Sequence, residues 1–370
     1  MAASPSPRAM APDTERVLIV DDSAVSRAVL ARIIDASDRF AAVGAVPTAS
    51  AALAFLERER VDVVLLDVEM PGMDGLTALP QLLAAGQGAR IIVVSSLASD
   101  GAESSIRAMA LGAADTLVKP PMGQRLAHFS DMLLEKLMRL SRRGPAAMPR
   151  ATGAEPATPA RSSAAPQDDT SPVAVPALGA FDIVTIGAST GGIHALSQLL
   201  RELPPSFRQP IVITQHLPGS FMPYFAAQIA VLGQRPCDVA TDRMRVRPGR
   251  IIVAPGDAHV GAVSLGDGAA AVRLLTEPAS SGCMPSIDPM LASFSDVYGA
   301  RMVAVILSGM GRDGAEGVRN VRDAGGKVLV QDQASSVVWG MPGTVAQAGH
   351  ADAILPPASI GRALAARRPS

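Results

Sequence analysis

Aromatic residues and cysteine are scarce in this chain, and neither sign of charge prevails. Only 3% of the 370 residues are Phe, Trp or Tyr, and two cysteines are too few for a disulfide framework or a Cys-rich zinc site. With 33 basic and 34 acidic residues the net charge is −1, which provides no basic field for nucleic acid or anionic lipid. No run approaches about 18 uninterrupted apolar residues, and the first residues contain no apolar signal segment. We therefore expect a soluble, cytoplasmic protein without a nucleic-acid partner or membrane insertion.

Length and composition indicate two domains joined by a linker. At roughly 100–200 residues per domain, the length favours two domains, and apolar residues, at 48%, suffice for two aliphatic cores. From Ser141 to Ala180 there is no aromatic residue, and most positions are Pro, Ala, Ser, Thr or Gly. Such a segment buries too little apolar surface to offset its ordering entropy. We predict domains at 15–140 and 181–366, with a flexible linker at 141–180.

Short apolar runs alternate with amphipathic segments on both sides of this linker. Before it, the strand-like runs are Val17–Val20, Ala42–Val46, Val61–Leu66, Ile91–Val94 and Thr116–Val118. After it, they are Ile183–Ile186, Ile211–Thr214, Ile251–Val253, Val303–Leu307 and Lys327–Val330. Continuous apolar strands between helices are typical of parallel sheets covered on both faces. The pattern predicts two doubly wound α/β domains, the first flavodoxin-like, that bind ligands at the carboxyl ends of their strands.

Acidic and other polar residues end successive strands of the first domain. Asp21 and Asp22 end the first strand, Asp67 the third, Ser95 the fourth and Lys119 the fifth. Three neighbouring carboxylates repel one another unless a cation joins them, and oxygen ligands suit Mg²⁺. A lysine and a hydroxyl beside that cation would suit a transferred phosphoryl group.

The segments VLIVDDS, VVLLDVEMPGMDGL, IIVVSS and LVKP together resemble the receiver domain of two-component response regulators, over Glu15–Leu140. The resemblance implies that Asp67 accepts phosphate from a chemotaxis histidine kinase. It also implies that Asp22 and Asp67 bind Mg²⁺ together with the backbone carbonyl of Glu69, while Asp21 completes the acidic pocket.

The same resemblance implies a switch role for two residues of the receiver. Ser95 lies at the position of the family's switch hydroxyl, and Lys119 at that of its invariant lysine. Many receivers carry an aromatic switch residue three positions before the lysine, where this chain has Thr116. The aromatic part of the switch is therefore not expected here.

A G-x-S-x-G arrangement opens the second domain. Ser189 lies between Gly187 and Gly191, after the strand-like run FDIVTI and before a helix. The glycines permit a sharp turn, and the helix N-terminus favours developing negative charge. A phosphate-binding loop is the competing interpretation, although the middle glycine of G-x-G-x-x-G and the P-loop lysine are absent. Taken alone, the turn supports both interpretations equally.

Candidates for a base and an orienting acid follow later strands. His216 ends the strand IVITQ, and His259, in VAPGDAH, is the second choice for the base. Asp313 lies in the glycine-rich loop GMGRDG after the strand MVAVILS. Asp288, in PSID, is the alternative acid, and it suits a helix N-cap equally well. The order Ser…His…Asp differs from that of α/β-hydrolases, and no H-E-x-x-H spacing favours a metallohydrolase.

The motifs IGASTGG, VITQHLPGSF, VAPGDAH, PSID, LSGMGRDG and QDQASSVVWGMP resemble the catalytic domain of chemotaxis protein-glutamate methylesterases over Phe181–Leu364. The resemblance implies hydrolysis of glutamate methyl esters on methyl-accepting chemoreceptors, together with deamidation of receptor glutamines. It implies Ser189 as nucleophile, His216 as general base, Asp313 as its orienting partner and Met310 as a backbone oxyanion donor. Ester hydrolysis would need no cofactor, whereas receiver phosphorylation would need Mg²⁺.

Two other classes of function fit a receiver at the N-terminus. A DNA-binding output domain would need a basic face and a helix-turn-helix, and the second domain instead alternates strands and helices. A catalytically silent scaffold would not need the serine, histidine and aspartate. One departure from the methylesterase pattern is Met284, which stands before PSID where the family commonly has arginine, and it bears on substrate docking.

Overall fold

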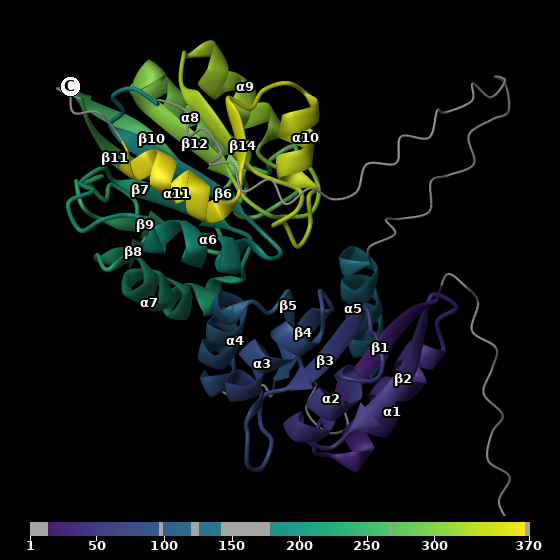
Figure 1. The fold of residues 1–370 in the computed structure, drawn as a ribbon. Coiled ribbons are helices and arrows are strands. Elements are labelled where there is room, and N and C mark those ends of the chain that lie inside the picture. Colours follow the sequence, from purple (N-terminus) through teal and green to yellow (C-terminus); the bar gives the residue numbers. More distant parts are fainter. Residues whose placement is uncertain (1–13, 96–98, 120–125, 142–177, 267, 367–370) are drawn as a thin grey trace, which may run out of the picture.

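Five parallel strands form the sheet of the amino-terminal domain, in the order β2-β1-β3-β4-β5. The computed structural model describes residues 14–95, 99–119, 126–141, 178–266 and 268–366 (Figure 1). The strands are β1 (Glu15–Val20), β2 (Phe40–Val46), β3 (Val63–Asp67), β4 (Arg90–Ser95) and β5 (Asp115–Val118). The helices are α1 (Ala24–Asp35), α2 (Ala49–Leu56), α3 (Gly75–Ala85), α4 (Ser99–Leu111) and α5 (Leu126–Leu140). The predicted five-unit parallel fold is confirmed.

Alternating strand residues cover two separate apolar layers of this domain. Leu18 and Val20 of β1 face α2 and α3, whereas Val17 and Ile19 face α1 and α5. Because side chains alternate across a strand, a wholly apolar strand is stable only when both faces are covered. Polar N-caps at Ser23, Thr48 and Asp74 begin α1, α2 and α3 by accepting a backbone N–H of the first turn.

The carboxyl-terminal domain is built on a seven-stranded parallel sheet in the order β14-β13-β12-β6-β7-β9-β8. Its strands are β6 (Ile183–Ala188), β7 (Ile211–Gln215), β8 (Cys237–Val239), β9 (Ile251–Val253), β12 (Met302–Ile306), β13 (Lys327–Gln331) and β14 (Ala353–Leu355). The strands β6, β7 and β12 are neighbours at its centre. The loops after these three strands therefore meet at one edge of the sheet.

Helices cover both faces of this sheet with aliphatic cores. α6 (Gly192–Arg201), α7 (Met222–Gly233) and α11 (Pro357–Ala365) contribute to one apolar layer. The opposite layer contains α8 (Ile287–Tyr298), α9 (Ala315–Asp323) and α10 (Met341–Gln347), and short 3₁₀ turns at Gly219–Phe221 and Gly299–Arg301 precede α7 and follow α8. None of the helices that the structure describes has both the length and the hydropathy needed to cross a membrane.

The sequence pattern predicted neither the short edge strands β8 and β14 nor an antiparallel hairpin of the second domain. β10 (His259–Gly266) pairs with β11 (Ala269–Leu275) as a separate two-stranded sheet. The hairpin packs on α8, where the Ser293 hydroxyl accepts the backbone N–H of Ala262. Small residues and glycines interrupt its alternation of apolar and polar positions, so the sequence pattern shows no clear strand there.

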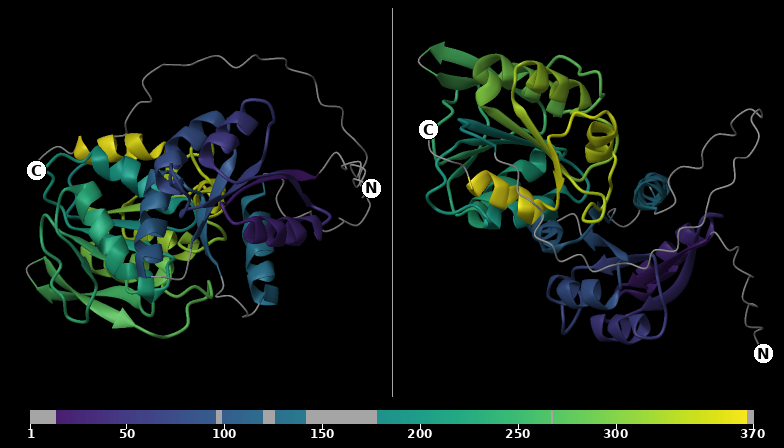
Figure 2. Two further views of the ribbon diagram at one scale, coloured as in Figure 1. Left: turned by 90° about the horizontal axis from the view of Figure 1, so that it is seen from below. Right: turned by 45° about the horizontal axis from the view of Figure 1, so that its top comes forward.

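Helix α4 of the first domain lies against α6 and α7 of the second (Figures 1 and 2). Ile106, Met109 and Ala110 are buried in the same apolar layer as α6 and α7. The carbonyl oxygen of Ala110 lies 3.2 Å from His194 Nδ1 and accepts a hydrogen bond from Ser197 Oγ at 3.3 Å. Most of the linker predicted at 141–180 lies outside the described residues, so its flexibility stays a prediction.

We expect a charge at Met109 to separate the two domains without unfolding either sheet. Met109 is 8% exposed, so Met109→Glu would put a carboxylate into an apolar layer of buried side chains. Hydrogen exchange in α4 and α6 should rise, while the strands stay protected. The control is Val25→Glu, since Val25 on α1 is 71% exposed. Unchanged exchange in α6 of the Met109 variant would contradict the packing described here.

Candidate active site

Three carboxylates gather where β1 and β3 end. Ligand oxygens of Asp21, Asp22 and Asp67 lie within 4.8 Å of one another. Asp21 and Asp67 are 1% and 4% exposed, whereas Asp22 is exposed. Lys119 Nζ, after β5, donates to Asp67 Oδ2 at 2.6 Å and lies 2.9 Å from Asp21 Oδ2. Four of the residues expected at the receiver site are thus brought together.

The electrostatics of this pocket suit a hard cation. Burial raises the pKa of Asp67, as does the neighbouring Asp21, although the hydrogen bond from Lys119 opposes both. Burial acts to lower the pKa of Lys119, but its contacts with Asp21 and Asp67 outweigh that and raise it. Lys119 thus pairs with two buried carboxylates at once. The carboxylate oxygens of Asp21, Asp22 and Asp67 are the kind of ligand that Mg²⁺ prefers. Glu69, whose N–H reaches Asp67 Oδ1 at 3.4 Å, follows on the adjoining loop.

Ser95 connects the pocket to the helix that meets the second domain. Its side chain is buried, and its Oγ lies 3.2 Å from Ser105 Oγ on α4. Ser105, which the sequence analysis did not single out, is itself fully buried. Ser95 on β4 and Ser105 on α4 are thus in direct contact. Thr116, on β5, lines the cavity between the domains.

Ser189 lies in a tight turn directly after the central strand β6. Its backbone N–H donates to Ser308 O at 3.0 Å, and its carbonyl accepts from Gln215 Nε2 at 3.0 Å. Gly191 has a φ of +76°, and a Cβ there would lie 2.5 Å from Val337, so the turn requires glycine. Helix α6 begins at the next residue, which directs its N-terminus toward the serine.

The half-buried His216 and the buried Asp313 form a pair beside this turn. They follow β7 and β12, the two strands that flank β6, and Asp313 Oδ2 accepts a hydrogen bond from His216 Nε2 at 2.7 Å. Asp313, 2% exposed, also accepts from Ser286 Oγ at 2.7 Å and Ile287 N at 2.8 Å. Burial opposes ionisation, but the bonds from His216 and Ser286 hold the pKa of Asp313 well below its usual range.

Ser189 and His216 line one cavity of about 580 Å³. Among the described residues, no hydrogen bond joins their side chains. His216 presents Nε2 to Asp313, so Nδ1 is the nitrogen left to take a proton from a nucleophile. Met310 and Met284, 44% and 40% exposed, also line the cavity, together with Cys283.

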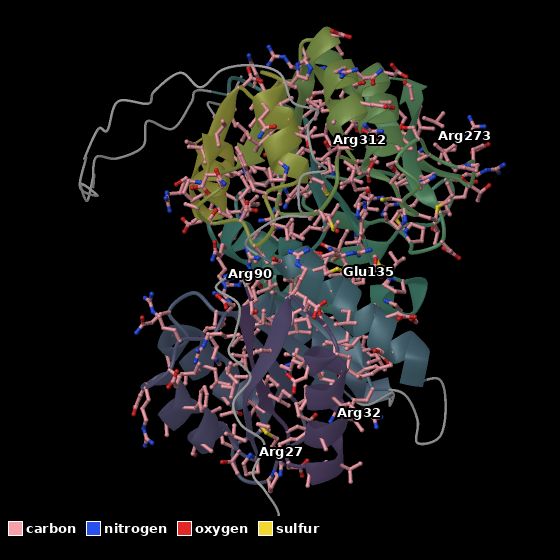
Figure 3. All side chains as sticks on the ribbon, turned by 90° about the vertical axis from the view of Figure 1, so that its right-hand side faces the viewer. Arg27, Arg32, Arg90, Glu135, Arg273 and Arg312 are labelled. Carbon is pink, nitrogen blue, oxygen red and sulfur yellow. The ribbon has the colours of Figure 1, made fainter. Side chains whose placement is uncertain are left out.

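The receiver supplies the opposite wall of this cavity. Met109, Thr116, Lys136 and Arg139 line it from α4, β5 and α5. Figure 3 shows Glu135 of α5 at the boundary between the domains, whereas Arg27 and Arg32 of α1 lie on the far side of the receiver. The receiver thus covers the loops that carry Ser189 and His216.

Asp288, the alternative acid, and His259, the alternative base, both lie outside the His216–Asp313 pair and make structural hydrogen bonds. Asp288 Oδ1 accepts the N–H of Gly317 at 2.7 Å, whereas His216 pairs with Asp313. His259 is 1% exposed, and its Nε2 donates to Glu277 O while its Nδ1 accepts from Ser286 N. His259 therefore supports Ser286, which supports Asp313. Ser286 was missed by the sequence analysis because a serine before a helix usually signals only a cap.

Comparisons with known proteins agree with this two-part organisation. A family model described as "CheB methylesterase" matches residues 184–364, and one described as "Response regulator receiver domain" matches residues 17–129. The protein-glutamate methylesterase/protein-glutamine glutaminase 1 of Paramagnetospirillum magneticum is 42% identical and covers 99% of each chain. A similarly named protein of Rhodospirillum centenum is 40% identical over 96% of this chain and 95% of its own. One from Azospirillum brasilense is 40% identical over 94% of this chain and 91% of its own.

We expect Asp288 to make the stability of the second domain fall between about pH 4 and pH 6. Burial, together with the nearby Asp313, raises the pKa of Asp288 to about 6. In the unfolded chain its pKa is about 3.9, so within this window the unfolded state has already lost the proton that the folded state keeps. Stability is therefore greatest below the window, falls through it, and is constant above about pH 6.

Asp288→Asn should remove this fall. The free energy of unfolding of the variant should exceed that of the unsubstituted protein by on the order of 1–3 kcal/mol at pH 7.5 and by nothing near pH 4. Denaturant unfolding at the two pH values measures the difference, with Asp296→Asn, at an exposed site on the same helix, as control. An equal effect of Asp288→Asn at both pH values would show that the carboxyl is not perturbed.

Proposed function

This chain belongs to the protein-glutamate methylesterase/protein-glutamine glutaminase family, and we propose that it demethylates chemoreceptors with a Ser-His-Asp triad under control of its receiver domain. Its substrates would be glutamate methyl esters on methyl-accepting receptors, in adaptation of chemotaxis-type signalling. The observation that carries the proposal is the His216–Asp313 pair beside Ser189 in one cavity. A receptor substrate and a histidine kinase agree with the cytoplasmic location predicted from the sequence.

The geometry supports a covalent mechanism. Ser189 Oγ attacks the ester carbonyl carbon while His216 Nδ1 takes the hydroxyl proton, and Asp313 stabilises the resulting imidazolium. Backbone N–H groups at the start of α6 and at Met310 are the candidates to bind the tetrahedral oxyanion. His216 then donates its proton to the departing methoxide, and methanol leaves a glutamyl ester on Ser189. Water, deprotonated by His216, hydrolyses that ester and restores the serine.

The same steps deamidate glutamine. The carbonyl carbon of a receptor glutamine replaces that of the ester, and ammonia leaves in place of methanol after protonation by His216. Both reactions give the same glutamyl ester on Ser189, and therefore the same product, glutamate. The buried Asp313 matters more for the amide, because its poorer leaving group depends more strongly on proton donation from the imidazolium.

Control of this activity is proposed to begin at Asp67. Its carboxylate would take a phosphoryl group from a chemotaxis histidine kinase, with Asp22, Asp67 and the Glu69 carbonyl holding Mg²⁺. Bound Mg²⁺ would offset the charge of the carboxylates and of the incoming phosphate. Lys119, already 2.6 Å from Asp67 Oδ2, would pair with the phosphoryl oxygens. Ser95 would turn from Ser105 toward the phosphate.

The proposed route of control runs through α4. The Ser95–Ser105 contact joins the phosphorylation pocket to α4, and Met109 and Ala110 of α4 pack against the catalytic domain. Withdrawal of Ser95 would alter the packing of α4 and weaken its contact with α6. The receptor would then reach the cavity, which the receiver otherwise covers. Since Thr116 replaces an aromatic residue, the switch would rely on Ser95 and Lys119.

Substitutions of the triad should distinguish the orienting acid from the serine and the histidine. Ser189→Ala and His216→Ala should each reduce methanol release from methylated receptor by about 10⁶-fold, and the double variant should be no slower. Asp313→Asn should cost about 10⁴-fold, because it removes the orienting charge and leaves the nucleophile in place. Ser264→Ala, at an exposed serine of the hairpin, is the control. Near-normal release from folded Ser189→Ala would end the covalent-serine interpretation.

The receiver variants should have opposite effects. Met109→Glu should raise activity on receptor by roughly 5–150-fold without phosphodonor, and phosphodonor should then add little. Asp67→Asn should keep the unphosphorylated rate and lose both activation and Mg²⁺-dependent phosphate incorporation. If Met109→Glu opens the domains yet leaves the rate unchanged, coverage by the receiver does not inhibit the enzyme.

A further inference from the structure

A thiol lies beside the catalytic pair and has no part in ester hydrolysis. Sγ of Cys283, a ring nitrogen of His216 and a carboxylate oxygen of Asp313 lie within 4.8 Å of one another. Cys283 is half-buried in the loop before α8, and it lines the same cavity as Ser189. One sulfur, one nitrogen and one oxygen donor therefore converge on a space that is accessible from the cavity.

This donor set has the chemistry of a zinc site. Zn²⁺ binds thiolate, imidazole and carboxylate at about 2.0–2.3 Å, so the ligand atoms of a tetrahedral site are roughly 3.3–3.6 Å apart. The three ligand atoms lie within 4.8 Å of one another, so small side-chain movements bring them to that spacing. The acidic pocket of the receiver is different in kind, because Asp21, Asp22 and Asp67 offer oxygen only and suit Mg²⁺.

One of the three ligands, Asp313, is already held in place. Asp313 accepts hydrogen bonds from Ser286 Oγ and the backbone N–H groups of Ile287 and Gly314, at 2.7, 2.8 and 3.1 Å. These bonds fix the orientation of the Asp313 carboxylate, which also accepts the hydrogen bond from His216. Outer hydrogen bonds of this kind strengthen metal sites because they orient the ligands before the metal arrives. The side chains of Cys283 and His216 are then the ones that have to adjust, because the 2.7 Å distance between His216 Nε2 and Asp313 Oδ2 is shorter than the spacing of zinc ligands.

Two carboxylates lie near the thiol of Cys283. A carboxylate oxygen of Asp313 is within 4.8 Å of its Sγ, and Asp288 is close enough to act on it electrostatically. A divalent cation would offset both carboxylates, which the uncharged thiol cannot do.

We propose that Cys283, His216 and Asp313 form a binding site for a borderline-soft divalent cation, with Zn²⁺ the best match, and that occupation of this site inhibits the esterase. The inhibitory part rests on the proposed role of His216. If Nε2 binds the metal, the imidazole loses its bond to Asp313; if Nδ1 binds, the nitrogen left for Ser189 is blocked. Either way His216 can no longer take the serine proton. The fourth position of the metal would face the cavity and hold water.

The experiment uses the full chain in excess Mg²⁺, which occupies the receiver pocket. Methanol release is measured against added Zn²⁺, and each variant is normalised to its own zinc-free rate. Cys283→Ser removes the sulfur ligand, and Cys237→Ser, at the half-buried cysteine of β8, is the matched control. A second readout is independent of activity: Cd²⁺ bound to a thiolate gives an ultraviolet charge-transfer band. That readout is applied to the same variants and to His216→Ala.

We expect Zn²⁺ to inhibit the unsubstituted protein and Cys237→Ser equally. Cys283→Ser should need at least about 10-fold more Zn²⁺ for half-inhibition, and should lose the Cd²⁺–thiolate band. His216→Ala should weaken that band by a similar factor. Equal zinc sensitivity of Cys283→Ser, or a band that survives in it and disappears in Cys237→Ser, would overturn the proposal. If no protein releases methanol even without zinc, the proposed function fails, and the Cd²⁺ band still decides the metal site.

Discussion

The buried carboxylate of Asp313 is the constraint on which the second domain depends. A carboxylate that is 2% exposed is stable only if hydrogen bonds replace those it would make with water. The donors here are the Ser286 hydroxyl, the His216 imidazole and the backbone N–H groups of Ile287 and Gly314. These donors come from different segments of the chain, so the folding of the loops after β7 and β12 is coupled to the orientation of one imidazole. The fold that stabilises Asp313 thereby also sets the direction in which His216 faces the cavity.

In the receiver, buried carboxylates are likewise stabilised by a polar partner, in this case a lysine. Two buried carboxylates share Lys119, and this leaves a negative pocket whose charge changes when phosphate and a cation enter. The change has a short path to the other domain, since Ser105 and Ala110 belong to one helix, α4. Under the proposed control, regulation and catalysis meet where α4 packs against α6 and α7. Because Ile106, Met109 and Ala110 make this layer apolar, a buried charge there would weaken it.

Much of this could be predicted from the sequence, for physical reasons. Uninterrupted apolar strands predicted both parallel sheets, and polar residues at strand ends predicted which side chains would converge. The antiparallel hairpin and Ser286 were missed, because small residues hide a strand pattern and because a serine before a helix usually signals only a cap. The contact of α4 with α6 was also beyond reach, since Met109 and Ala110 resemble ordinary core residues of a receiver. The cluster of Cys283 with His216 joins loops distant in sequence, so only the tertiary structure brings them together.

The most direct test of the account is methanol release from methylated chemoreceptor membranes by the unsubstituted full chain, with and without a small phosphodonor in Mg²⁺. The account predicts slow release without phosphodonor and a rise of roughly 5–150-fold with it, because the receiver then uncovers the cavity that holds Ser189 and His216. Failure of the folded, phosphorylated protein to release methanol would contradict it.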